Sequence, residues 1–68
     1  MITEIGIVAG EIWQYLEKYK ETTLSKLIEV TGKDRDILIM GIGWLVREGH
    51  IILTRKENDY KIVLRKKD

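Results

Sequence analysis

Cysteine and proline are absent from this 68-residue chain, and histidine occurs once, as His50. Without cysteine there is no disulfide, and a single histidine falls short of the ligand set of a structural zinc site. We therefore expect no metal and no other cofactor. A chain this short buries only about 60% of the surface that its unfolded form exposes. Association with a second subunit is then the remaining source of extra stability.

Long apolar runs are also missing. The longest stretch without a charged residue is 37–46, about half the length that a bilayer requires. The first ten residues carry Glu4 where a signal peptide would have a basic start. We expect one soluble, cytoplasmic domain over residues 1–68 that does not contact a membrane.

Strong net charge is absent too, since the formal charge is +1. Basic residues nevertheless concentrate toward the end, because residues 55–68 hold six basic and three acidic side chains. A domain dedicated to nucleic acid usually has a stronger basic surface. The bias favours a weak, non-specific affinity for DNA, or simply a solvated strand.

Apolar residues spaced three and four apart predict a helix over residues 4–20. Its predicted core stripe comprises Ile5, Val8, Ala9, Ile12, Leu16 and Tyr19. Gly6 and Gly10 lie beside this stripe near Trp13, and two glycines one turn apart suggest the close approach of another backbone.

Two further helices follow, joined by a glycine-containing turn. Thr23 is a plausible N-cap of the first, which ends at Gly32, and Asp34 caps the second, which runs to residue 48. Two helices with this connection form the helix-turn-helix pattern.

Two strand-like segments, 50–56 and 60–66, come next and are separated by Glu57-Asn58-Asp59, where Asn58 and Asp59 suit a tight turn because they tolerate positive φ. Ile51 and Leu53 should face Ile62 and Leu64. The element order predicts an α+β winged helix-turn-helix: three helices and a C-terminal β-hairpin wing, with a further short strand near Thr22-Thr23.

In such a fold the second helix of the motif enters the major groove and needs polar side chains to contact bases. Here Leu38, Ile42 and Leu45 form one apolar face, and Ile37, Met40 and Trp44 form a second, outward stripe. A partner subunit related by a two-fold axis is the simplest cover for that stripe. There are two alternatives: Met40 and Trp44 pack within the chain, or the stripe packs against a different protein.

Two segments carry a resemblance to a known family. One runs from Ile5 to Leu16 and contains Ile5, Gly6, Ala9, Gly10, Ile12, Trp13 and Leu16; the other contains Gly43, Trp44, Leu45, Arg47 and Glu48. The chain resembles a family of short prokaryotic winged helix-turn-helix proteins of uncharacterised function. Members commonly have alanine at position 41 and often have aspartate at position 49. The resemblance implies the fold and a stand-alone domain, but no active site and no ligand.

Catalysis finds no support, because His50 has no evident partner and the Asp34 and Asp36 side chains diverge on their helix. We therefore predict a non-enzymatic binding module. The first hypothesis is a DNA-associated transcriptional regulator that acts as a homodimer. The alternative is a dimerisation or protein-interaction module whose recognition helix is covered. It includes strand addition at the edge of the last strand, beside Ile52 and Val63.

The candidate residues divide by these two functions. Nucleic-acid contacts would come from Lys33, Arg35, Arg55, Lys56, Lys61 and Arg65. Such residues bind phosphates without reading sequence, and Glu57 and Asp59 at the wing tip would oppose them. Dimer contacts would come from Gly6, Gly10, Trp13, Ile37, Met40 and Trp44.

Overall fold

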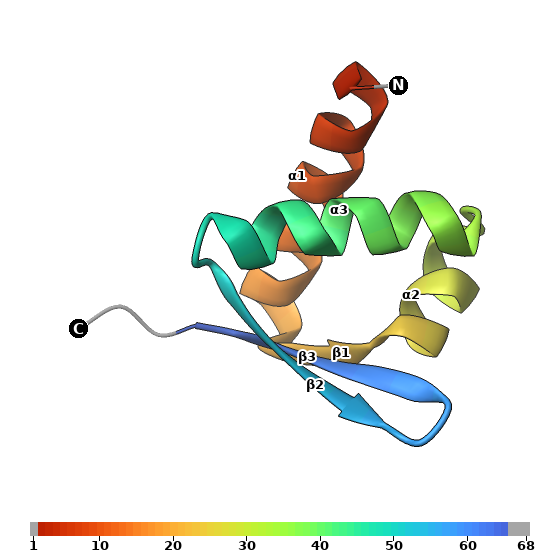
Figure 1. The fold of residues 1–68 in the computed structure, drawn as a ribbon, viewed down its shortest axis with the longest axis vertical. Helices are drawn as coiled ribbons and strands as arrows, with labels where there is room; N and C mark the ends of the chain where they lie inside the picture. Colours follow the sequence, from red (N-terminus) through yellow and green to blue (C-terminus); the bar gives the residue numbers. More distant parts are fainter. Residues whose placement is uncertain (1, 66–68) are drawn as a thin grey trace.

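The computed structural model describes residues 2–65, which form three helices and a three-stranded antiparallel sheet (Figure 1). The elements in chain order are α1 (Ile2–Tyr19), β1 (Glu21–Thr23), α2 (Leu24–Thr31), α3 (Arg35–Arg47), β2 (Ile51–Lys56) and β3 (Asp59–Leu64). This arrangement confirms the predicted α+β winged helix-turn-helix, including the short strand at Thr22-Thr23. Helix α1 starts two residues earlier than expected.

The core lies between the three helices and the inner face of the sheet. Its buried apolar residues are Val8, Ala9, Ile12, Leu16, Leu24, Leu27, Leu38, Ile42, Leu45, Ile51 and Ile62. The predicted stripe of α1 is thus confirmed at its centre. Its last member was placed wrongly, because Tyr19 is 52% exposed. Tyr19 is the final residue of α1, and its ring packs on that of Tyr15 with the centroids 4.6 Å apart.

Local capping explains where the two helices of the motif begin and end. The Thr23 hydroxyl accepts a hydrogen bond from the Lys26 N–H, and the Asp34 carboxylate accepts one from the Asp36 N–H. Gly32 adopts the left-handed conformation, φ 67°, that ends α2. All three residues therefore act as the sequence predicts.

The sheet has the strand order β1-β3-β2, so β3 is the central strand. Ile51 lies opposite Leu64 and Leu53 opposite Ile62, as predicted. The predicted strand addition beside the last strand is wrong, because β3 is paired on both sides. The turn also differs from expectation, since the positive φ (45°) falls at Glu57 and not at Asn58 or Asp59.

Helices α1 and α3 cross at Gly41, and the first turns of α1 project beyond α3 (Figure 1). A Cβ at Gly41 would lie 3.1 Å from Val8 Cγ1, 3.3 Å from Ala9 N and 3.3 Å from Ile12 Cδ1. The close approach of two backbones therefore occurs at Gly41. The prediction that Gly6 and Gly10 mark such a contact finds no counterpart within the described chain, because a Cβ at either position would meet nothing within 4 Å.

Candidate binding surfaces

Helix α3 exposes apolar side chains along the flank that faces away from the wing. Trp44 is 49% exposed and Met40 is 40% exposed, whereas Ile37 is half-buried and packs against the core. Ile37 and Met40 border a hollow of about 290 Å³ with Glu4 and Val8 of α1. Two of the three residues in the predicted outward stripe are thus open to solvent, and the third contributes mainly to the fold.

The remaining dimer candidates lie on α1. Gly6 and Gly10 are exposed, with space around each α-carbon. Trp13 is half-buried and packs against the core and against His50, with the two ring centroids 3.8 Å apart. His50 therefore has an aromatic neighbour that the sequence did not reveal, and much of the Trp13 indole is already used within the chain.

Two of the six basic candidates are engaged with carboxylates. Lys33 Nζ lies 3.5 Å from Glu11 Oε1 of α1, and Lys61 Nζ lies 3.4 Å from Glu21 Oε1 of β1. Both pairs are partly solvent-exposed, so each stabilises the fold only slightly. A phosphate would nevertheless have to compete with these carboxylates for the two ammonium groups.

The other basic candidates do not form one surface. Arg35, at the start of α3, and Arg55, on β2, line a common polar hollow of about 240 Å³ beside the wing turn. Lys56 follows Arg55 and is exposed. Arg65 lies at the far end of the sheet, where its Nη1 would be 3.5 Å from a Cβ at Gly49. Only Arg35 and Arg55 share one hollow, which Glu57 and Asp59 also line, and the Lys56 side chain lies on the other face of β2.

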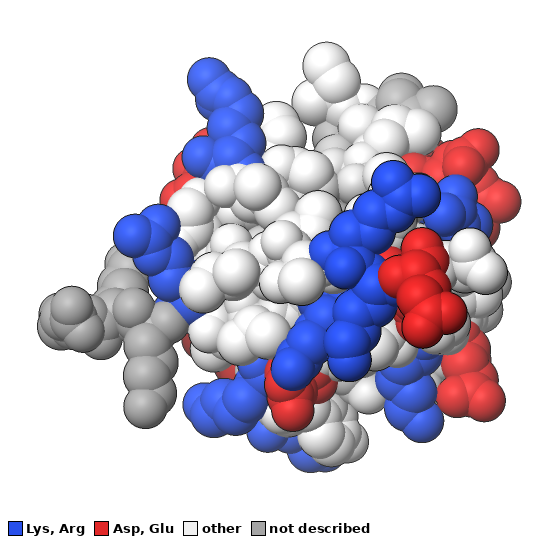
Figure 2. Space-filling model, turned by 60° about the horizontal axis from the view of Figure 1, so that its bottom comes forward, with Lys and Arg blue, Asp and Glu red and all other residues white. Residues whose placement is uncertain are grey.

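Figure 2 shows the charge distribution on the face that carries the wing. Lysine and arginine side chains form a band across this face, with acidic side chains at its borders. A broad uncharged area separates this band from further basic side chains. The surface therefore offers a local cationic strip beside uncharged groups, and not a continuous basic footprint.

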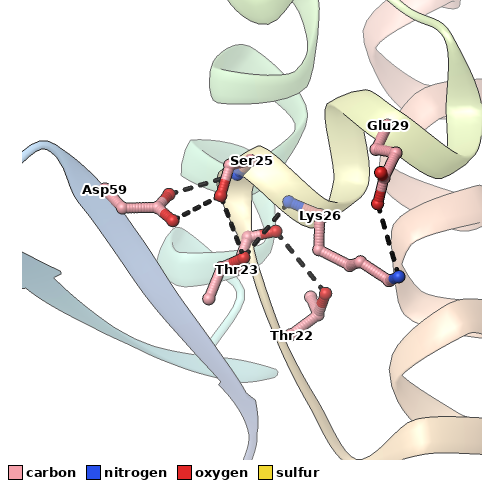
Figure 3. Close-up of polar contacts among 6 residues, drawn as sticks. All are labelled: Thr22, Thr23, Ser25, Lys26, Glu29 and Asp59. Carbon is pink, nitrogen blue, oxygen red and sulfur yellow. Dashed lines mark hydrogen bonds and ion pairs between the residues drawn. The ribbon is translucent and has the colours of Figure 1, made fainter.

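The wing turn is tied to α2 through Asp59. Its carboxylate accepts hydrogen bonds from the Ser25 N–H (3.1 Å) and the Ser25 hydroxyl (2.5 Å), as Figure 3 shows. The Ser25 hydroxyl lowers the pKa of Asp59 from its ordinary value, and the N–H groups of Tyr60 and Ser25 add to this effect against the opposing influence of burial. Asp59 therefore has a structural role, and because its lowered pKa favours the ionised form, it remains with Glu57 an acidic residue beside Arg35 and Arg55.

An apolar groove separates α3 from the wing, and the sequence did not predict it. Its lining residues are Ile39, Ile42, Gly43, Leu53 and Tyr60, around a volume of about 150 Å³. Gly43 leaves space on the α3 side of the groove, since a Cβ there would meet nothing within 4 Å. The helical spacing of Ile39 and Gly43 was visible in the sequence, but the position of Leu53 beside them depends on how the wing folds back.

No group of three His, Cys, Asp or Glu side chains within residues 2–65 is arranged to hold a metal ion. In the same part of the chain, no helix combines the length and apolar character needed to span a bilayer.

The comparisons with known proteins agree with this architecture. The winged helix-turn-helix domain family DUF2582 matches residues 1–64. An uncharacterized protein of Methanocaldococcus jannaschii is 31% identical over 64 residues, which cover 91% of each chain. Winged helix-turn-helix domains commonly bind DNA and are typically non-enzymatic. With its three helices, its wing and a match over almost its whole length, the chain belongs to the DUF2582 family of winged helix-turn-helix domains.

Proposed function

We propose that this domain is a non-enzymatic, cytoplasmic binding module that acts as a homodimer, with α3 serving as a contact surface for protein. One observation carries the proposal. The exposed middle of α3 presents Met40, Gly43 and Trp44, none of which offers the paired donors and acceptors that base-edge recognition uses. A helix that is apolar on two sides is typical of burial on both.

The energetics of the exposed flank support self-association. A half-exposed tryptophan leaves on the order of 100 Å² of aromatic surface in water. Covering apolar surface contributes about 25 cal/mol per Å², so Trp44 alone would contribute about 2.5 kcal/mol per subunit. That is a large fraction of the stability of a domain this small. Met40 on the same flank and the open surface at Gly6 and Gly10 would extend the contact.

Sedimentation equilibrium at micromolar concentration tests this proposal. The wild-type chain is expected as a dimer, and Trp44→Glu as a monomer of lower thermal stability, since a carboxylate cannot be buried in the contact without a large cost. Val30→Glu is the matched control, because Val30 is 46% exposed on α2, outside the proposed contact. This variant should remain dimeric. A monomeric wild type would refute the proposal.

A second candidate, a DNA-associated transcriptional regulator acting as a dimer, is favoured by a different observation. Arg35 and Arg55 share one hollow at the junction of α3 and the wing. Guanidinium groups bind the phosphate oxygens of the DNA backbone, and such contacts do not depend on the base sequence. The two candidates use different flanks of α3, so a dimer could still contact the DNA backbone weakly. Sequence-selective binding at physiological salt would show that base readout, and not protein contact, is the main function of α3.

A further inference from the structure

The groove between α3 and the wing lies next to a strand edge that has no partner. Strand β2 pairs with β3 on one side, and no other strand within residues 2–65 pairs with it on the other. Leu53 of β2 lines the groove together with Ile39 and Gly43 of α3. An open edge and an apolar groove thus share a border, and Leu53 belongs to both.

The register shows which backbone groups this edge offers. The Arg65 N–H donates to the His50 carbonyl, so the antiparallel pair 50/65 is a hydrogen-bonded pair. Such pairs alternate along an antiparallel ladder. The residues at 51, 53 and 55 therefore direct their N–H and C=O groups away from β3. Side chains alternate between the two faces of a strand, and Leu53 is on the groove side.

We propose that this edge and groove bind an extended segment of a partner protein by strand addition. The segment would hydrogen-bond to the outward backbone groups of Ile51, Leu53 and Arg55. One apolar side chain of the segment would enter the groove above Gly43. Main-chain hydrogen bonds with a pocket for alternate side chains are the general basis of peptide recognition at a sheet edge.

The charges around the groove define the chemistry of that segment. Tyr60 lines both the apolar groove and the neighbouring polar hollow, whose charged lining residues are Arg35, Arg55, Glu57 and Asp59. The Asp59 carboxylate is hydrogen-bonded to Ser25, and strand β2 itself carries Arg55 and Lys56 and no acidic residue. A segment that leaves the groove at this end therefore reaches two guanidinium groups. Glutamate or aspartate residues beside the apolar anchor would pair with them. The preferred partner is an extended acidic-apolar segment.

A second copy of this chain fits the same edge less well. Strand β2, with the sequence IILTRK, contains Arg55 and Lys56 and no acidic residue. Two such strands side by side would bring four cations to one edge without compensating charge on either strand. Charged residues on an edge strand generally oppose this kind of pairing.

Selection from a displayed library of random nonapeptides against the immobilised full chain tests the proposal. Enriched peptides should alternate apolar and other residues and carry Asp or Glu. In a ¹⁵N-labelled sample, the selected synthetic peptide should shift the amide signals of Ile51, Leu53 and Arg55 and those of Ile39 and Gly43. Absence of enrichment, or shifts confined to another face, would overturn the proposal.

Two variants at one position separate binding from folding. Gly43→Leu should fill the groove and weaken peptide binding at least tenfold. Gly43→Ala should keep affinity within threefold, because a Cβ there meets nothing and most of the groove stays open. Equal affinity of both variants and the wild type would contradict the assigned site. If the β2 amide signals shift with protein concentration in the absence of peptide, the edge binds a second copy of the chain instead. If DNA displaces the peptide from this edge, the edge belongs to nucleic acid.

Discussion

Asp59, at the start of β3, accepts hydrogen bonds from both the backbone N–H and the hydroxyl of Ser25, at the start of α2. The two residues are 34 positions apart in the chain. This contact ties the wing turn to the first turn of α2, at the end of the wing where Arg55 and Tyr60 border the polar hollow with Arg35. The relative position of wing and α3, on which the polar hollow and the apolar groove depend, thus rests partly on one carboxylate.

Removal of that carboxylate should destabilise the domain. Asp59→Ala leaves an N–H in the first turn of α2 without its partner, and losses of helix-terminal partners cost about 1 kcal/mol. Thermal unfolding followed by circular dichroism measures the change. Glu57→Gln in the same turn is the control and should unfold like the wild type. A stability equal to that of the wild type for Asp59→Ala would show that the contact contributes nothing.

The same contact predicts an acid-dependent loss of stability. The pKa of Asp59 is lowered in the folded state, so the folded chain holds the ionised form more strongly than the unfolded chain does. Its contribution is complete above the unfolded value, about 3.9, and is lost as the pH falls through the lower folded value. Asp59→Asn should flatten this part of the curve of unfolding free energy against pH. Parallel curves for the two proteins below pH 4 would contradict the assignment.

Gly41 and Gly43 lie on the same helix and should respond differently to substitution. Gly43→Ala should stabilise the protein by about 0.8–1 kcal/mol, because it gains helix propensity in open space. Gly41→Ala gains the same propensity but forces the Ala9 backbone and two side chains of α1 to yield, so we expect a change within about 1 kcal/mol of zero. Gly41→Leu should cost about 3 kcal/mol or prevent folding, since the helices must separate.

Urea denaturation of the three variants measures these differences. The comparison between the two alanine variants is the informative one, because helix propensity cancels. Equal stabilisation at both positions would mean that α1 and α3 do not approach closely at Gly41.

Binding to DNA, where it occurs, should be weak and depend steeply on salt. Arg35→Ala and Arg55→Ala should each lower affinity for any sequence and reduce the slope of log K against log salt by about one. Lys33→Ala and Lys61→Ala should have smaller effects, because those side chains already lie beside Glu11 and Glu21. Fluorescence anisotropy with a labelled random duplex measures all four. A larger effect at the two lysines would overturn this ranking.

The sequence predicted the architecture because the local signals agreed with one another. Thr23, Gly32 and Asp34 mark helix ends through their own backbone chemistry, and alternation between positions 51 and 64 sets the register of the hairpin. These effects act over a few residues and leave a pattern in the chain. The buried centre of α1 follows from helical spacing in the same way.

Features that depend on contacts distant in sequence were not predictable in this way. The helical wheel identified two apolar faces of α3 but could not show that Gly41 lies against α1, or that Ile39 borders a groove with Leu53. The tie between Ser25 and Asp59 likewise gives no periodic signal. The basic candidates were identified by residue type alone, and the structure separates Arg35 and Arg55 from Arg65 at the opposite end of the sheet.

An isotope-filtered nuclear Overhauser experiment tests the central claim most directly. Equal amounts of ¹³C,¹⁵N-labelled and unlabelled chain are mixed, unfolded and refolded, and only signals between different molecules are recorded. The account predicts cross-peaks between subunits that involve the Trp44 indole and the Met40 methyl group. A spectrum without intermolecular peaks at millimolar concentration, or with peaks only from other surfaces, would contradict it.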